Sequence, residues 1–78
     1  MNKLKISLHT AEQIAEFVDI CSKYECDIKV YDGRTILDAK SIIAIFSINK
    51  EKVIEVQAIS SDESIILRFI DNMKKFKA

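Results

Sequence analysis

The sequence predicts an α+β fold in which one antiparallel sheet is covered on one face by three helices. Four segments alternate apolar and polar residues, a pattern that is typical of half-buried strands. Three other segments carry apolar residues three and four positions apart, which is typical of amphipathic helices. The dipeptide Asp32-Gly33 between two of the strands favours a tight hairpin. Because each element has only one apolar side to bury, we expect a two-layer sandwich with the order βαββαβα.

Length and charge limit the possible classes of protein. The chain has 78 residues, which is enough for one domain over residues 1–78. Lys plus Arg and Asp plus Glu number 12 each, so the chain lacks the positive field that nucleic acid binding requires. No apolar run approaches the ~20 residues of a membrane span, and no signal peptide is recognisable. We therefore expect a cytoplasmic monomer without membrane insertion.

The first strand and the first helix are predicted from the N-terminal residues. Alternation over Lys3–Leu8 predicts the strand. Thr10 and Gln13 have the spacing of a capping box, which predicts a helix from Ala11 to about Tyr24. The apolar stripe of this helix consists of Ile14, Phe17, Val18 and Cys21.

The middle of the chain predicts a hairpin and a short helix. Residues 26–31 alternate as a strand, Asp32-Gly33 forms the turn, and the strand Arg34–Leu37 returns. Asp38 is then the predicted N-cap of a helix over residues 39–46, AKSIIAIF.

The last third of the chain predicts a strand and a helix. After the polar connection Ser47–Lys52, the segment Val53–Ile59 alternates as the fourth strand. Ser60 and Glu63 form a second capping-box pair, which predicts that a helix starts there. Its apolar stripe is Ile66, Phe69, Ile70 and Met73, and it ends in Lys74, Lys75 and Lys77. The stripes of the first and third helices are expected to share one core under the sheet.

Cysteine and histidine usage does not support metal chemistry. Cys21 and Cys26 fit neither the CxxC spacing of redox and zinc sites nor a disulfide framework. With one histidine in the chain, a four-ligand zinc site would need both cysteines and a carboxylate. We expect two reduced, structural thiols and neither a metal nor another cofactor.

The order βαββαβα and the segment SKYECDIKVYDGRTILDAKSIIAIFSI, residues 22–48, resemble the HPr phosphocarrier family of the bacterial phosphoenolpyruvate:sugar phosphotransferase system. The resemblance covers nearly the whole chain. It implies an open-faced sandwich of four antiparallel strands under three helices. It also implies Enzyme I, Enzyme II components and HPr kinase as partners.

The phosphoryl-accepting motif of the family is altered in this chain. The family carries the phosphoryl group on a histidine at the start of the first helix, followed by a small residue, Arg and Pro. Counted back from Tyr24, these four positions hold Thr10, Ala11, Glu12 and Gln13, and His9 lies one residue earlier. Glu12 places a negative charge where the family has the guanidinium that matches phosphoryl oxygens. His9 is either a phosphoryl acceptor or an exposed residue before the capping threonine.

Two further features come from the region after the hairpin. By the same resemblance Ser41 takes the position of the regulatory serine, with a capping role as the alternative. The short helix and the residues after it carry more apolar side chains than one stripe can bury. In the family this face docks partners, which implies docking residues Ile42, Phe46 and Ile48. The alternative is that Phe46 and Ile48 cover the sheet edge.

The resemblance, with its altered motif, implies two alternative functions. The first is a divergent HPr-like module that regulates or docks proteins, with weak or no phosphoryl transfer. The second is a working phosphocarrier that accepts a phosphoryl group on His9 from Enzyme I and passes it to a sugar-specific Enzyme II. A carrier of this kind has no turnover of its own.

Overall fold

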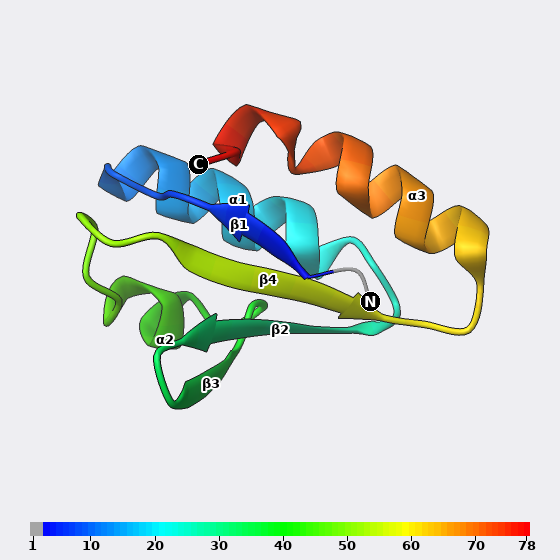
Figure 1. Cartoon of the computed structure of the whole chain (residues 1–78), viewed down its shortest axis with the longest axis horizontal. Helices are drawn as coiled ribbons and strands as arrows, with labels where there is room; N and C mark the ends of the chain where they lie inside the picture. The colour runs from blue at the N-terminus through cyan, green and yellow to red at the C-terminus, as the bar shows by residue number, and fades with distance from the viewer. Residues whose placement is uncertain (1–2) are drawn as a thin grey trace.

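The computed structural model describes residues 3–78, and its order of elements confirms the predicted α+β fold (Figure 1). The strands and helices are β1 (Leu4–Ile6), α1 (Ala11–Ser22), β2 (Asp27–Asp32), β3 (Thr35–Asp38), α2 (Ile42–Phe46), β4 (Ile54–Ile59) and α3 (Glu63–Asn72). A single 3-10 turn, η1 (Lys74–Phe76), follows α3.

The sheet has the strand order β1-β4-β2-β3, and every pairing is antiparallel. In the β2–β3 hairpin, Asp32 lies opposite Thr35, so Gly33 and Arg34 form a two-residue loop. Gly33 has a φ of 61°, a conformation that costs glycine little because it has no Cβ. The hairpin predicted at Asp32-Gly33 is therefore confirmed.

The core lies between the sheet and the helices. Alternate residues of β2 and β4 are buried, while the residues between them form the open face of the sheet. Of the eight stripe residues expected to share this core, six are buried: Ile14, Phe17, Val18, Cys21, Phe69 and Met73. Ile66 is half-buried against the core and Ile70 is half-buried near β1. Both stripes thus face the interior, as predicted.

The sequence predicted the wrong N-cap and the wrong first residue for the second helix. Asp38 does not cap α2; its carboxylate accepts the Lys40 N–H at 3.0 Å at the end of β3. The N-cap is Ser41, whose hydroxyl oxygen accepts the Ala44 N–H at 3.3 Å. Residues 39–41 therefore form a turn, and the helix is shorter than the apolar segment suggested.

The start of the third helix was also predicted too early. The N-cap is Asp62, which accepts the Ser64 N–H at 3.0 Å. Ser60 lies in the preceding turn, where its hydroxyl oxygen accepts the Asp62 N–H at 3.0 Å. The serine thus positions the capping residue instead of capping the helix itself.

The C-terminal residues pack beside β1. This strand covers Leu4–Ile6 and is shorter than the predicted Lys3–Leu8. The Ser7 N–H donates to the Phe76 carbonyl at 2.8 Å, and the Ala78 N–H donates to the Lys5 carbonyl at 3.2 Å. The Phe76 side chain is buried and packs edge-on against the Phe17 ring, with the two ring centroids 5.8 Å apart. The end of the chain therefore completes both the sheet edge and the core.

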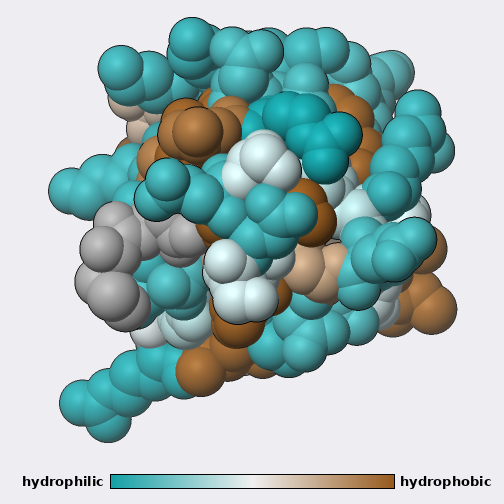
Figure 2. Space-filling model, turned by 90° about the vertical axis from the view of Figure 1, so that its right-hand side faces the viewer, coloured by the Kyte–Doolittle hydropathy of each residue, from teal (hydrophilic) through white to brown (hydrophobic). Residues whose placement is uncertain are grey.

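The two ends of the molecule differ. Figure 2 looks onto the end where β4 passes into α3 and shows a mainly hydrophilic surface with small, separate hydrophobic patches. At the opposite end, the start of α1 and the loop between α2 and β4 come together (Figure 1). Within residues 3–78, no helix has both the length and the apolar character that a membrane crossing demands.

Candidate functional site

The start of α1 is closed by two side-chain hydrogen bonds, from Thr10 and from Gln13. Thr10 is the N-cap, and its hydroxyl oxygen accepts the Gln13 N–H at 3.1 Å. The Gln13 side-chain oxygen accepts the His9 N–H at 2.7 Å, one residue earlier than in the usual capping box. His9 is exposed and lies directly before the cap, a position that fits either of its two interpretations.

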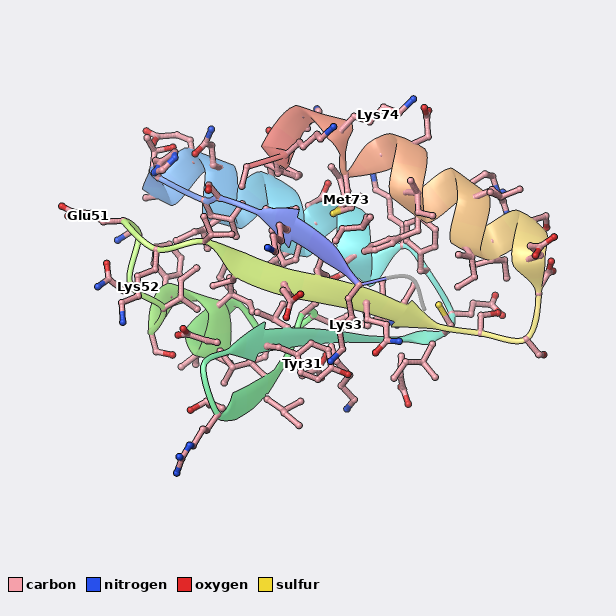
Figure 3. The ribbon with its side chains drawn as sticks, viewed as in Figure 1. Lys3, Tyr31, Glu51, Lys52, Met73 and Lys74 are labelled. Atoms are coloured by element: carbon pink, nitrogen blue, oxygen red, sulfur yellow. The ribbon has the colours of Figure 1, made fainter. Side chains whose placement is uncertain are left out.

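The His9 ring is bound by a residue far away in the sequence. Its Nδ1 atom lies 2.9 Å from the carbonyl oxygen of Lys50. A carbonyl oxygen only accepts hydrogen bonds, so Nδ1 carries the proton in this contact. Glu51 and Lys52, labelled in Figure 3, lie in the same loop at the end of the molecule where α1 begins.

The charge at the start of α1 does not favour a bound phosphoryl group. Glu12 is the acidic residue of the first turn and is exposed. Its carboxylate interacts well with the positive end of the helix but repels a second anion at the same place. Thr10 already occupies the amide of Gln13, so one of the donors that a phosphoryl group needs is taken.

Ser41 lies at the start of α2 and is half-buried. Its hydroxyl caps the helix, as the alternative interpretation held, and its N–H donates to the Asp38 carbonyl at 3.0 Å. Lys40 is turned to another partner, because its ammonium group donates to the Tyr24 carbonyl at 2.5 Å. A phosphate on Ser41 would therefore meet a lysine that is already engaged.

An apolar surface lies on α2, which packs against both α1 and β3. Ile42, Ile43 and Phe46 form this surface, and Ile43 is 83% exposed. Ile48, which the sequence had placed among the docking residues, is only 6% exposed and belongs to the core. The Lys50 ammonium lies 5.7 Å from the centroid of the Phe46 ring, so the loop that binds His9 also borders the apolar surface.

The two cysteines are free, in agreement with the expected structural thiols. Burial raises the pKa of the Cys21 thiol from 9.0 to about 12, which keeps it protonated and unreactive. Cys26 is half-buried against the core. In the described part of the chain, no three His, Cys, Asp or Glu side chains are grouped so that they could hold a metal ion.

Two contacts at this site had no clear signal in the sequence. The Lys50 carbonyl that binds His9 is 41 positions away, and a backbone group carries no residue signature. The second is the hydrogen bond from the Lys40 ammonium group to the Tyr24 carbonyl. A lysine next to a serine suggests a partner for a phosphate on that serine, not a partner for a distant carbonyl. The sequence predicted this loop only as a polar connection, and in the structure the Asn49 side-chain oxygen accepts the Glu51 N–H at 2.9 Å.

These features define a small open-faced α+β sandwich protein with an exposed histidine before its first helix and an apolar surface on its second. The family model "PTS HPr component phosphorylation site" matches residues 3–76. The chain therefore belongs to the HPr family of phosphocarrier proteins of the phosphotransferase system.

Two solved structures agree with this assignment. HPr-C-His from Thermoanaerobacter tengcongensis is 25% identical, with a TM-score of 0.73, over 96% of this chain and 93% of that protein. A phosphocarrier protein HPr from Bacillus anthracis str. Ames is 26% identical, with a TM-score of 0.67, over 87% of each chain. Comparison with curated protein sequences gives no match.

Proposed function

We propose that this chain is a divergent HPr-like module that docks or regulates proteins of the phosphotransferase system, with weak or no phosphoryl transfer. The observation that carries the proposal is the start of α1, where Glu12 is the charged residue of the first turn and no basic residue accompanies it. Phosphoryl transfer depends almost entirely on positioning and charge stabilisation. The first turn of α1 lacks the guanidinium that, by the family resemblance, would stabilise the phosphoryl group.

The proposed docking surface is formed by Ile42, Ile43 and Phe46. All three side chains are exposed although they are large and apolar, and they lie together on one short helix. An exposed apolar patch of this kind is typical of a protein interaction site. Its position next to the loop that binds His9 suits partners such as Enzyme I or Enzyme II components, which read the surface around the first two helices.

The second candidate is a working phosphocarrier that uses His9. Its support is that the imidazole is exposed and held in one place by the Lys50 carbonyl. Orientation of the acceptor contributes to transfer even where the cation is missing. The two candidates differ in one measurable quantity, the rate at which Enzyme I phosphorylates His9.

Labelling with phosphoenolpyruvate distinguishes the candidates. We expect incubation with labelled phosphoenolpyruvate and Enzyme I to give weak acid-labile labelling compared with an ordinary HPr. The double change Thr10→His with Glu12→Arg should raise the labelling, because it restores the acceptor and its charge partner at the positions that the family resemblance assigns. Rapid labelling of the unchanged chain that disappears in His9→Ala would establish the second candidate instead.

Docking is tested by substitution on the apolar surface. Ile43→Ser should weaken binding to Enzyme I or an Enzyme II component in an NMR titration, because it removes the most exposed apolar side chain of the surface. Leu67→Ser is the matched control, since Leu67 is also a largely exposed apolar residue but lies on α3. Equal affinities of the two variants would exclude α2 as the docking surface.

A further inference from the structure

The two edges of the sheet are not equivalent. The outer side of β1 is covered, because this strand bonds to residues 76–78 at the end of the chain. At the other edge β3 pairs with β2 on its inner side, and nothing within residues 3–78 pairs with its outer side. Figure 1 shows β3 at the lower margin of the molecule, with no helix or strand beyond it. The strand β3 is therefore the open edge of the sheet.

The register of the hairpin shows which backbone groups of β3 point outward. The Ala39 N–H donates to the Ile28 carbonyl at 3.0 Å, and pairs that bond in this way alternate with pairs that do not. The odd-numbered residues of β3 therefore turn their backbone groups toward β2, whereas Ile36 and Asp38 turn theirs away from it. The Asp38 carbonyl already accepts the Ser41 N–H at 3.0 Å. Both backbone groups of Ile36 and the N–H of Asp38 are thus open to a further strand.

The side chains along this edge are charged at both ends and apolar in the middle. Ile36 is 61% exposed, Arg34 lies in the turn before β3, and Asp38 is the last residue of the strand. Among residues 3–78, neither Arg34 nor Asp38 takes part in an ion pair. One Asp38 side-chain oxygen accepts the Lys40 N–H at 3.0 Å. The edge therefore has a basic, an apolar and an acidic residue at every second position.

This pattern is complementary to itself in one antiparallel register. When Ile36 lies opposite Ile36 of a second copy, Arg34 of each copy lies opposite Asp38 of the other. A register centred on Leu37 would place Ile36 opposite a carboxylate, and one centred on Asp38 would place two carboxylates opposite each other. Opposite charges across a strand pair are stabilising and like charges are destabilising, so the charges favour the register centred on Ile36.

We propose that β3 pairs with β3 of a second copy of this chain, with the two-fold axis at Ile36. The two Ile36 residues exchange N–H···O bonds, and the two sheets become one continuous antiparallel sheet. Each charge at the end of the strand gains a partner of opposite sign. A contact through one short strand is small, so the dimer is weak and forms at high protein concentration.

The dimer contact is separate from the residues of the proposed function. It contains neither the residues at the start of α1 nor Ile42, Ile43 and Phe46 of α2. Labelling by phosphoenolpyruvate and the docking titration can therefore fail while the dimer is found, and the reverse.

Self-association of the unchanged chain is measured first. Sedimentation velocity and 1H–15N NMR are recorded over concentrations up to ~1 mM, where weak contacts become populated. We expect a concentration-dependent dimer, with the largest amide shifts at Ile36 and Asp38. In a sample of mixed isotope labels, the Hα of Thr35 should contact the Hα of Leu37 of the second copy, because these residues form the closer, non-hydrogen-bonded pair. A chain that stays monomeric throughout would overturn the proposal.

The apolar centre of the contact is tested by Ile36→Lys, which should abolish the dimer. Leu67→Lys is the matched control, because Leu67 is also 61% exposed but lies on α3. It should associate like the unchanged chain. A dimer that persists in Ile36→Lys, or that is lost equally in both variants, would overturn pairing through β3.

Charge reversal tests the register. Arg34→Glu makes both end pairs acidic and Asp38→Lys makes both basic, so each variant alone should associate roughly 10-fold more weakly. An equimolar mixture of the two variants should associate like the unchanged chain, because every pair across the contact again has opposite charges. A mixture as weak as its components, or single variants that associate normally, would overturn the register.

The charge-reversal test needs a check of the fold. Asp38→Lys removes the oxygen that accepts the Lys40 N–H, so its 1H–15N spectrum is compared with that of the unchanged chain. Arg34 lies in an exposed turn, so Arg34→Glu keeps the fold and tests the charges even if Asp38→Lys does not fold. In that case the double variant Arg34→Glu with Asp38→Lys is replaced by Arg34→Gln, which should associate with an affinity between those of Arg34→Glu and the unchanged chain. Equal affinities of all three chains would overturn the register.

Discussion

At the scale of single residues, the function of this protein depends on which polar atoms are already occupied. The Thr10 hydroxyl and the Gln13 side chain satisfy donors at the start of α1. In the same way, the Lys40 ammonium is bound to the Tyr24 carbonyl and not directed to Ser41. The residue types alone suggested N–H groups and a lysine that are free to bind a phosphate. In the structure some of these groups are already hydrogen-bonded within the protein.

Ser41 is proposed as a site of regulatory phosphorylation. Treatment with a bacterial HPr kinase and ATP should add one phosphate, and Ser41→Ala should abolish the addition. Ser47→Ala is the control, because Ser47 is the other serine next to α2 and is more exposed. Mass spectrometry of the two variants decides the matter, and an unchanged phosphate content in Ser41→Ala would exclude this site.

Loss of the cap needs a separate measurement in that experiment. Ser41→Ala also removes the oxygen that accepts the Ala44 N–H, which should lower the free energy of unfolding by about 1 kcal/mol. A urea titration shows whether the variant stays folded under the conditions of the kinase reaction. A folded variant that takes up no phosphate supports the proposal.

At the scale of elements, the helix caps show how local patterns compete. At the start of α3 the sequence predicted Ser60 as the N-cap, with Glu63 at capping-box spacing from it, whereas the structure has Asp62 as the N-cap. In the structure the two act in series, since Ser60 binds the Asp62 N–H and Asp62 binds the Ser64 N–H. A capping pattern in the sequence therefore locates the start of a helix only to within two or three residues. The backbone geometry decides which of the neighbouring residues is the N-cap.

Asp62 should matter more to α3 than Ser60 does. Hydrogen bonds from the Ser64 hydroxyl and N–H lower the pKa of the Asp62 carboxyl below its ordinary value of 3.8. A lowered pKa in the folded state means that Asp62 stabilises the fold above pH 3.8, and that this contribution is lost as the pH falls through the lower, folded-state pKa. Asp62→Ala should therefore destabilise the chain at neutral pH and much less at acidic pH.

Urea unfolding of Asp62→Ala and Ser60→Ala, followed over pH, measures this difference. Ser60→Ala should show a smaller loss with little dependence on pH, because a hydroxyl does not titrate in that range. If the two variants lost equal stability at every pH, Ser60 would share the capping role and the assignment of the N-cap would change.

Element order and type could be predicted here because alternation and helical stripes are local. Buried Ile28 and Val30 are followed by the turn residue Gly33, and the strand, turn and register follow from these few positions. The His9–Lys50 contact could not be predicted in this way, because it joins a side chain to a backbone carbonyl across two loops. The buried Ile48 was misjudged for a related reason: the chain turns after α2, so the helical stripe no longer predicts which side is exposed.

At the scale of the whole molecule, stability depends on contacts between the two ends of the chain. Phe76 is 3% exposed and packs edge-on against Phe17 of α1, while its carbonyl binds the Ser7 N–H. A domain of this size has a small core, so each large buried side chain contributes a considerable share of its stability. The last turn of the chain is thus part of the fold and not an appendage to α3.

Phe76→Ala should lower the free energy of unfolding by about 3 to 5 kcal/mol, the usual cost of removing a buried aromatic ring. Thermal and urea unfolding measure the loss. Phe76→Leu should cost clearly less, because it keeps an apolar side chain in the same space. A loss of less than about 1 kcal/mol in Phe76→Ala would mean that the C-terminal turn is not part of the cooperative unit.

The pairing of β1 with the C-terminal residues has a consequence for synthesis. β1 leaves the ribosome before β4 and residues 76–78, yet it pairs with β4 on one side and with residues 76–78 on the other. While the later segments are being made, β1 has no partner and its apolar side chains are uncovered. We therefore expect the nascent chain to depend on chaperones until residues 76–78 have emerged, since unpaired strands of partly made proteins are prone to aggregation.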